Sequence, residues 1–390
     1  MTALMNTYNR VDLAFERGEG AYLITADGRR YLDFASGIAV TALGHCHPHL
    51  VKTLQEQGAK LWHTSNLFRV PEQERLAQRL CDATFADAVF FGNSGAEAVE
   101  CGFKLIRKYQ DDFGDPKRFR VIAFEGAFHG RTLATLAAAG NEKYLKGYAP
   151  TVEGFEQVPF GNLNEVRARI TPETAAILIE PVQGEGGMRA ADAQFLKDLR
   201  TVCNEFGLLL MFDEVQCGMG RTGRLFAHEW AGVTPDIMST AKAIGGGFPL
   251  GACLATSKVA AAFGHGSHGS TFGGNPLAMA IGNAVMDVML APGFLDNVAK
   301  FGRHLDRRLA DLTKRFPQVF VEARGMGLIR GLKCGGSNAE VVDQARASGL
   351  LLVTAADNVV RLLPPLIVSE AEIDQAVDVL AGVASRAKAA

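Results

Sequence analysis

Short apolar runs alternate with longer segments of helical periodicity through the middle of the chain. A short apolar run between polar residues is typical of a buried strand, whereas apolar residues three and four positions apart indicate an amphipathic helix. The helical segments include Ala96–Tyr109 and Ala193–Phe206. Buried strands separated by such helices predict an α/β domain with a mostly parallel sheet and with ligands at the carboxyl ends of its strands. The expected strands are Ala88–Phe91, Arg120–Phe124, Ala175–Ile179, Leu208–Phe212, Ile237–Ser239 and Leu250–Ala255.

A change of pattern near Pro292 divides the chain. The helical segment Leu277–Leu290 ends at a Pro-Gly pair, which is a strong boundary signal. The helical segment Val298–Arg315 and several short apolar runs follow, and they indicate a smaller α+β domain. We therefore expect an N-terminal segment, 1–45, that packs with the small domain, a large domain, 46–290, and a small domain, 291–390. The strands expected outside the large domain are Ala21–Thr25, Arg30–Asp33, Val319–Val321, Leu328–Leu332 and Val359–Leu363.

The composition is that of an ordinary soluble protein, with 48% hydrophobic residues, 21% charged residues and a formal net charge of −2. Without a basic excess or a polybasic run, neither nucleic acid nor a membrane surface is expected as a partner. We expect no secretory signal, because the first residues lack an apolar core, and no apolar run approaches a membrane span. The seven cysteines are dispersed without a CxxC pair, which favours reduced thiols in a cytoplasmic protein.

Lys242 lies among small residues just before the glycine triplet Gly245–Gly247. A lysine in such a place has little water around it, and desolvation lowers the pKa of its amine. A free amine can attack a carbonyl and form a Schiff base. Glycine-flanked lysines also occur in surface turns, so this segment alone leaves both interpretations open.

The segment Gly92–Ala98 joins an expected strand to an expected helix. Asn93 or Ser94 can cap the helix, and Gly95 and Ala96 let a ligand approach the amides of its first turn. This end of a helix carries partial positive charge and suits a phosphate, although a plain capped helix start has the same pattern. The chain lacks a Walker-type loop, and its first domain lacks a dinucleotide fingerprint after a strand.

Asp213 and Glu214 stand at the carboxyl end of the apolar run Leu208–Phe212. A carboxylate beside a pyridinium nitrogen stabilises the protonated ring and makes it an electron sink. Asp213 is the expected ring partner, because Glu214 points to the other side if the strand continues. An acid that only caps a turn is the alternative.

Phe128 and Arg131 follow another expected strand. Phe128 can stack on a flat ring, although a lone phenylalanine usually belongs to the core, and Arg131 can hold a carboxylate with its planar fork. Arg361 lies inside an apolar run, where a buried arginine needs an anionic partner.

Two loops and one histidine-rich turn complete the candidates. Glu185 lies in a glycine-rich loop and can bring a flexible acid to a site, while Ser270 and Thr271 can donate to a phosphate or substrate or simply form a turn. The turn Gly44–His49 holds three histidines and a cysteine. So tight a turn does not easily direct them to one tetrahedral ion, and no metal is expected.

These segments, in this order and spacing, resemble the class III (ornithine-type, subgroup II) pyridoxal-phosphate aminotransferases over essentially the whole chain. The resemblance implies the PLP-dependent transferase fold type I and a homodimer whose active sites lie at the subunit interface. The segments that carry it are Tyr31–Phe34, Gly44–Pro48, Asn93–Ala98, Phe128–Thr132, Glu180–Gly187, Asp213–Gly223, Ser239–Gly251 and Ser270–Pro276.

The resemblance also implies roles around pyridoxal 5'-phosphate. Lys242 would form the Schiff base and carry the proton between substrate and cofactor, while Asp213 would pair with the pyridine nitrogen and Gln216 with the ring hydroxyl. Phe128 would cover one face of the ring. The phosphate would be bound by a set of three residues that includes one from across the dimer interface. These are Gly95, Ala96 and, from the other subunit, Thr271.

The resemblance implies that Arg131 holds the α-carboxylate of the substrate. It also implies that Ser270, in the same loop as Thr271, contacts the substrate. Glu185 and Arg361 would form a gate. Paired, they leave room for a terminal amine, and apart they free Arg361 for the carboxylate of glutamate or 2-oxoglutarate. One pocket would thereby serve two substrates in the successive half-reactions of a ping-pong mechanism.

Ile38 bears on the choice of amine. Ornithine-specific members of the family tend to carry a tyrosine there, which meets the free α-amino group, whereas an apolar residue suits an acylated amine. We therefore expect transfer of the δ-amino group of N2-acetylornithine to 2-oxoglutarate, a reaction of arginine biosynthesis. Succinylornithine, N-succinyl-diaminopimelate, ornithine and 4-aminobutyrate are alternative substrates. An aminomutase would need no keto acid, and a regulator that only binds the cofactor would transfer no amino group.

Overall fold

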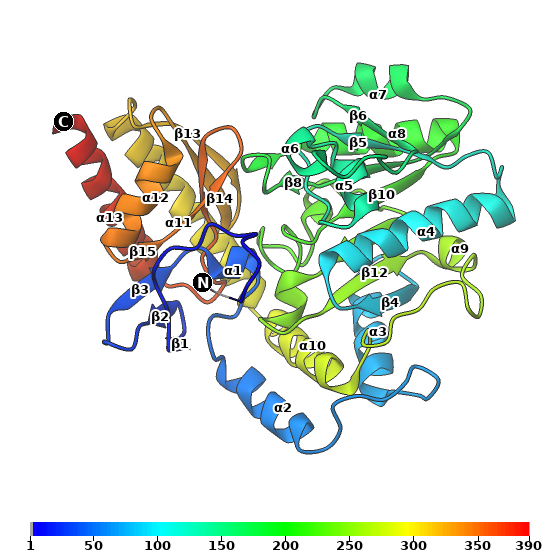
Figure 1. Cartoon of the computed structure of the whole chain (residues 1–390), viewed down its shortest axis with the longest axis horizontal. Helices are drawn as coiled ribbons and strands as arrows, with labels where there is room; N and C mark the ends of the chain where they lie inside the picture. The colour runs from blue at the N-terminus through cyan, green and yellow to red at the C-terminus, as the bar shows by residue number, and fades with distance from the viewer. Residues whose placement is uncertain (1–2, 390) are drawn as a thin grey trace.

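A seven-stranded sheet forms the centre of the large domain in the computed structural model, which describes residues 3–389 (Figure 1). Six of its strands run parallel, and only β12 runs against its neighbours. The α/β class with a mostly parallel sheet is thus confirmed. In sheet order the strands are β4 (Ala88–Gly92), β12 (Gly251–Ala255), β11 (Ile237–Thr240), β10 (Leu209–Asp213), β7 (Thr174–Ile179), β5 (Arg120–Phe124) and β6 (Phe155–Val158).

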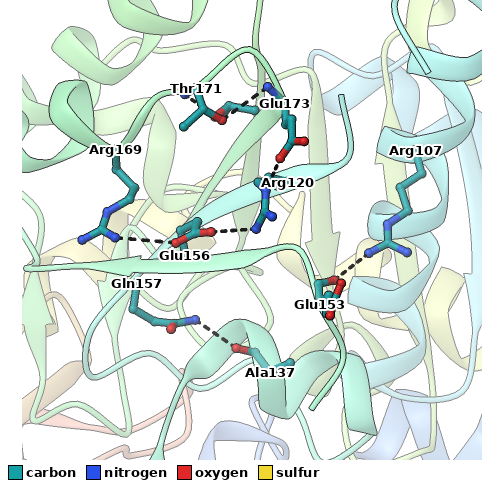
Figure 2. Close-up of polar contacts among 10 residues, drawn as sticks. Arg107, Arg120, Ala137, Glu153, Glu156, Gln157, Arg169, Thr171 and Glu173 are labelled. Carbon is teal, nitrogen blue, oxygen red and sulfur yellow. Dashed lines mark hydrogen bonds and ion pairs between the residues drawn. The ribbon is translucent and has the colours of Figure 1, made fainter. Parts of the chain in front are cut away.

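The edge strand β6 is the one strand of this sheet that apolar runs do not predict, because two of its four residues are polar. Figure 2 shows how charged side chains occupy this edge. The guanidinium of Arg120 on β5 bonds to Glu156 on β6 at 2.9 Å and to Glu173 at 2.6 Å, and Arg169 approaches Glu156 from the other side at 3.7 Å. Charges on an edge strand hinder pairing with a further strand.

Helices cover both faces of the sheet. Because side chains along a strand point alternately to the two faces, the apolar side chains of β10 need a covering layer on each face. Leu210 and Phe212 pack into a core that includes α8 (Ala193–Phe206), while Met211 packs into a core that includes α4 (Gly95–Phe113). Helix α10 (Pro276–Met289) is almost entirely buried. The other helices of this region are α2 (Pro48–Gly58), α3 (Pro71–Ala83), α5 (Leu133–Ala139), α6 (Glu142–Leu145), α7 (Leu163–Arg169), α9 (Ser257–Ala260) and the 3-10 turns η1 (Ala227–Trp230) and η2 (Lys242–Gly245).

The last part of the chain forms an antiparallel sheet in the order β13-β14-β17-β16, with helices packed against it. The N-terminal strands β1, β2 and β3 form a separate sheet with β15, in which Leu32 is the partner of Leu350 (Figure 1). The bounds are β1 (Arg17–Glu19), β2 (Tyr22–Ile24), β3 (Arg30–Asp33), α11 (Phe294–Arg315), β13 (Phe320–Met326), β14 (Ile329–Cys334), α12 (Asn338–Ala347), β15 (Leu350–Leu351), β16 (Val353–Ala355), β17 (Val359–Leu362) and α13 (Glu370–Ala389).

Arg221 joins the loop after β10 to the C-terminal part of the chain. It is 1% exposed, and its guanidinium donates to the backbone oxygens of Leu328, at 3.3 Å, and Pro364. The amide of Leu328 donates in return to the backbone oxygen of Arg221 at 2.9 Å. Burial lowers the pKa of Arg221 to about 9. This contact fixes the chain shortly after β17 against the large domain.

Within residues 3–389, no single helix has both the length and the apolar character that a membrane span requires. Helices α10 and α11, bent by 70° at their junction, meet that test only as a pair. Two of the three histidines in the turn Gly44–His49 bond to carboxylates: His45 to Asp33 and His49 to Asp287.

Candidate active site

A cavity of about 330 Å³ opens where the parallel strands end. The carboxyl ends of parallel strands meet at one edge of a sheet, so residues far apart in sequence converge there. Each of five strands leads into a segment that lines the cavity. These residues are Gly95 and Ala96 after β4, Phe128 and His129 after β5, Glu180 after β7, Asp213, Val215 and Gln216 at the end of β10, and Lys242 after β11.

Lys242 begins the 3-10 turn η2 with a left-handed backbone, φ 49°. A non-glycine residue in this region costs of order 1–3 kcal/mol and persists where the surrounding structure imposes it. Burial lowers the pKa of the Lys242 amine, the carboxylates of Glu185 and Asp213 oppose this shift, and Arg361 adds to it. The net lowering gives a larger share of free amine, the form that attacks a carbonyl.

Asp213 is 3% exposed and uses both carboxylate oxygens. Oδ1 accepts a hydrogen bond from the amide of Val215 at 3.0 Å, and Oδ2 lies 2.7 Å from Nδ1 of His129. The His129 ring is itself buried and also lines the cavity. Both oxygens of this buried carboxylate are thus held in place, and the group can pair with a cationic nitrogen.

The N-terminus of α4 faces the cavity through Gly95 and Ala96. Ser94 caps the helix: its hydroxyl accepts from the amide of Glu97 at 3.2 Å, and its backbone oxygen accepts from the amide of Ala98. A Cβ added at Gly95 would lie 2.6 Å from a methyl carbon of Val215. Glycine therefore keeps the backbone close to the cavity wall, where the amides of the first turn can bind an anion.

These residues fit pyridoxal 5'-phosphate. Gln216 Oε1 is buried and has no hydrogen-bond partner among the described residues, and a hydroxyl donor from a ligand would satisfy it. Asp213 can pair with the nitrogen of a pyridine ring, and the backbone amides at the start of α4 can bind a phosphate. The amine of Lys242 can react with an aldehyde.

Arg131 is exposed and is not among the residues that line the cavity, and its guanidinium lies over aromatic rings. The guanidinium carbon lies 3.9 Å from the ring centre of Tyr144 and 5.8 Å from that of Phe128. The two rings meet edge to face, with centres 6.4 Å apart. This stack limits the directions in which Arg131 can point.

Glu185 and Arg361 form an ion pair, as the two predicted gate residues should when the gate is closed. Arg361 is 3% exposed, and it also donates to the backbone oxygen of Thr354 at 3.0 Å. Glu185 keeps about a quarter of its side chain exposed, at 26%. The acid is therefore the partner with more freedom to move.

Ser270 and Thr271 do not reach the cavity of their own chain. Ser270 Oγ accepts from the side-chain amide of Asn93 at 3.2 Å and from the amide of Gly273 at 3.0 Å. Thr271 is exposed, and Phe272 beside it is 62% exposed. A role for Thr271 at a phosphate would require a second copy of the chain.

Ile38 lies in a left-handed turn formed by α1 (Ser36–Ala39), whose four residues have φ between 47° and 65°. Such a turn is costly for L-residues, and most of all for a β-branched one. Ile38 is 37% exposed, and Val40 directly after the turn lines the cavity.

Three residues of the site were not predicted as such: His129, Glu180 and Tyr144. Glu180 carries the same signal as Asp213, an acid directly after a buried strand, and could have been found by it. His129 and Tyr144 carry no such signal, because their roles depend on contacts with Asp213 and Arg131 that only the fold creates.

Comparison with known proteins places the chain in a family. The family model described as aminotransferase class-III matches residues 4–383. The acetylornithine aminotransferase of Brucella suis biovar 1 (strain 1330) is 60% identical over 373 residues, which are 96% of this chain and 93% of that protein. That of Mesorhizobium japonicum is 60% identical over 377 residues, 97% and 94% of the two chains.

Solved structures of aminotransferases also resemble this chain. N-acetylornithine aminotransferase from Stenotrophomonas maltophilia K279a is 37% identical, with a TM-score of 0.85 over 98% of each chain. The ornithine aminotransferase from Toxoplasma gondii, described with partial occupancy of PLP at its active site, is 28% identical, with a TM-score of 0.92 over 96% of this chain and 91% of that one.

Proposed function

Since this chain belongs to the class III aminotransferases, we propose that it transfers the δ-amino group of N2-acetyl-L-ornithine to 2-oxoglutarate. The products are N-acetyl-L-glutamate 5-semialdehyde and L-glutamate, and the reaction belongs to arginine biosynthesis. The observation that carries the proposal is the desolvated amine of Lys242 in one cavity with Asp213 and the start of α4. Relatives of the same name at 60% identity support the choice of substrate.

The cofactor is pyridoxal 5'-phosphate, as in the family. When bound, its protonated ring supplies an electron sink that stabilises negative charge on the substrate carbon next to nitrogen. Asp213 would keep the proton on the ring nitrogen, Gln216 would bind the ring hydroxyl, and Phe128 would cover the ring. Gly95 and Ala96 would bind the phosphate with backbone amides, together with Thr271 of the partner subunit.

Lys242 would hold the cofactor through its amine, and the same amine would accept and return the proton that moves in each half-reaction. Both roles require a free amine at the working pH. The lowered pKa of Lys242 meets this requirement.

Two arginines orient the two substrates. Arg131 holds the α-carboxylate of the acylated amine, while the closed pair of Glu185 and Arg361 leaves the end of the cavity to the terminal amino group. In the second half-reaction Glu185 moves aside, and Arg361 receives a carboxylate of 2-oxoglutarate. Ile38 would offer the acyl group an apolar contact, and Ser270 of the partner subunit would contribute to the binding of the substrate.

The active form is a homodimer with shared sites, and an exposed apolar surface beside Thr271 supports this. The side chains of this surface belong to two segments that contact each other. Asn66 donates to the backbone oxygen of Gly273 at 2.9 Å, and the ring centres of His63 and Phe272 lie 5.3 Å apart. Exposed apolar groups of this size mark contact surfaces. They are Trp62 (68% exposed), Leu67 (89%), Phe68 (68%) and Phe272 (62%).

The proposed substrate is tested with a panel of amines, each supplied with pyridoxal 5'-phosphate and 2-oxoglutarate. We expect N2-acetylornithine to give the highest kcat/KM for glutamate formation, ahead of ornithine, succinylornithine, N-succinyl-diaminopimelate and 4-aminobutyrate. A faster reaction with another amine would overturn the substrate assignment. Product formed without any keto acid would indicate an aminomutase instead.

A further inference from the structure

Glu180 is a carboxyl group inside the cavity that the roles above do not use. It follows β7 directly, is 6% exposed and lines the cavity together with Asp213 and Lys242. Its Oε2 accepts a hydrogen bond from the amide of Phe128 at 3.1 Å. Within the described residues, Glu180 Oε1 has no hydrogen-bond partner. This oxygen is not fully enclosed by protein atoms, so part of its surface remains accessible.

The charged groups that face Glu180 come from three other segments. Asp213 at the end of β10 and Glu185 after β8 (Val182–Gln183) are both acids, and Lys242 is the base among them. The guanidinium of Arg361 is occupied by Glu185, and the imidazole of His129 by Asp213. Within the described residues, neither of these two side chains is left to form an ion pair with Glu180.

Burial and the neighbouring acids act on Glu180 in the same direction. Burial raises the pKa of Glu180 well above its usual value, and the charge of Asp213 raises it further. The amide of Phe128 and the amine of Lys242 lower it, but they do not compensate. Carboxyl groups that share a buried site do not all ionise, because each charge disfavours the next.

We propose that Glu180 is a neutral carboxylic acid in the working enzyme and that its free oxygen donates a hydrogen bond to an oxygen of the bound cofactor or substrate. The Phe128 amide occupies one oxygen as an acceptor, so the proton resides on the other. The ligand side of this inference rests on the proposed function.

Neutral Glu180 also serves the amine of Lys242. A third negative charge in the cavity would stabilise the ammonium form of Lys242 and reduce the share of free amine. A protonated carboxyl group provides a polar donor in the same place without that charge. Asp213 thereby remains the negative partner of the ring nitrogen, while Glu180, a carboxyl group in the same cavity, is protonated.

Infrared difference spectroscopy tests the protonation state directly. At neutral pH, the spectrum of the wild-type holoenzyme minus that of Glu180→Gln should contain the carbonyl stretch of a protonated carboxylic acid, shifted in heavy water. The matched control is Glu165→Gln on the exposed face of α7, which should give carboxylate bands only. Carboxylate bands alone for Glu180 as well would overturn the proposal.

The same band reports the hydrogen bond. If a cofactor oxygen is the acceptor, the band should move to lower frequency when pyridoxal 5'-phosphate is added to the protein freed of cofactor. If a substrate oxygen is the acceptor, the band should move only when N2-acetylornithine is added afterwards. A band that stays in place through both additions would refute the donor role.

Kinetics provide a second measurement with conservative rescue. Glu180→Gln keeps a neutral donor and should retain kcat within a few-fold, whereas Glu180→Ala should lose at least tenfold more. Equal losses in both variants would contradict a neutral donor, because they would indicate that the charge matters. If the wild type itself transfers no amino group, the proposed function fails, while the infrared band still decides the protonation of Glu180.

Discussion

Nδ1 of His129 lies 2.7 Å from Oδ2 of Asp213, and both side chains are almost fully buried. With Oδ1 held by the amide of Val215, the carboxylate has one fixed orientation towards the cavity. We infer that His129 is a positioning residue for the proposed ring partner Asp213.

His129→Asn keeps an N–H donor near the position of Nδ1, whereas His129→Phe keeps a ring and removes the donor. A hydrogen bond to a charged group contributes roughly 1.5–3 kcal/mol, so the phenylalanine variant should lose about 10- to 100-fold in kcat or cofactor affinity. The asparagine variant should lose much less. Equal activity of the two variants would show that the contact with Asp213 has no functional weight.

The lowered pKa of Lys242 predicts a pH dependence. The share of free amine rises as pH increases through the pKa, so a lowered pKa moves that rise to lower pH. In protein freed of cofactor, labelling of Lys242 by pyridoxal 5'-phosphate and borohydride should therefore increase at lower pH than labelling of surface lysines. Peptide mass spectrometry measures both in one sample. Identical pH curves would refute the shift.

Glu185→Ala removes the acid that pairs with Arg361. The freed guanidinium should favour a carboxylate at that end of the cavity, so kcat/KM should rise for glutamate and fall for N2-acetylornithine, changing their ratio by about tenfold or more. Single-turnover rates with each amine measure this ratio, and Glu125→Ala in an exposed position is the control. An unchanged ratio would remove the gate from the mechanism.

Tyr144→Leu removes the ring that lies 3.9 Å from the Arg131 guanidinium, whereas Tyr144→Phe retains it. A cation–π contact contributes about 0.5–2 kcal/mol, so the leucine variant should raise the KM for N2-acetylornithine roughly 2- to 30-fold with little change in kcat. The phenylalanine variant and Tyr148→Leu, at a residue 57% exposed, should resemble the wild type. A loss confined to kcat would argue against a role in binding.

The sequence predicts the features of this fold that depend on local pattern. Most strands of the large sheet are continuous apolar runs, and helix α8 has the predicted bounds, Ala193–Phe206. Asp213 and Lys242 could be proposed because strand ends of a parallel sheet converge, which is a property of the topology rather than of any single contact.

Other features depend on contacts that no local pattern encodes. Strand β6 is short and half polar, and its place is set by pairing with β5. The left-handed turn at Ile38 has unfavourable local energy and exists only because the surrounding structure imposes it. The role proposed for Thr271 needs a second chain, because a single subunit does not bring Thr271 to the cavity.

The central claim is that Lys242 and bound pyridoxal 5'-phosphate move the amino group of N2-acetylornithine. A single-turnover absorbance experiment on the wild type and Lys242→Ala tests it most directly. In the wild type, N2-acetylornithine alone should convert the cofactor spectrum to that of the amine form, and 2-oxoglutarate should reverse the change. The alanine variant should bind cofactor without the covalent bond and react slower by orders of magnitude. A wild type without a cofactor band, or an alanine variant that turns over at a normal rate, would contradict the account.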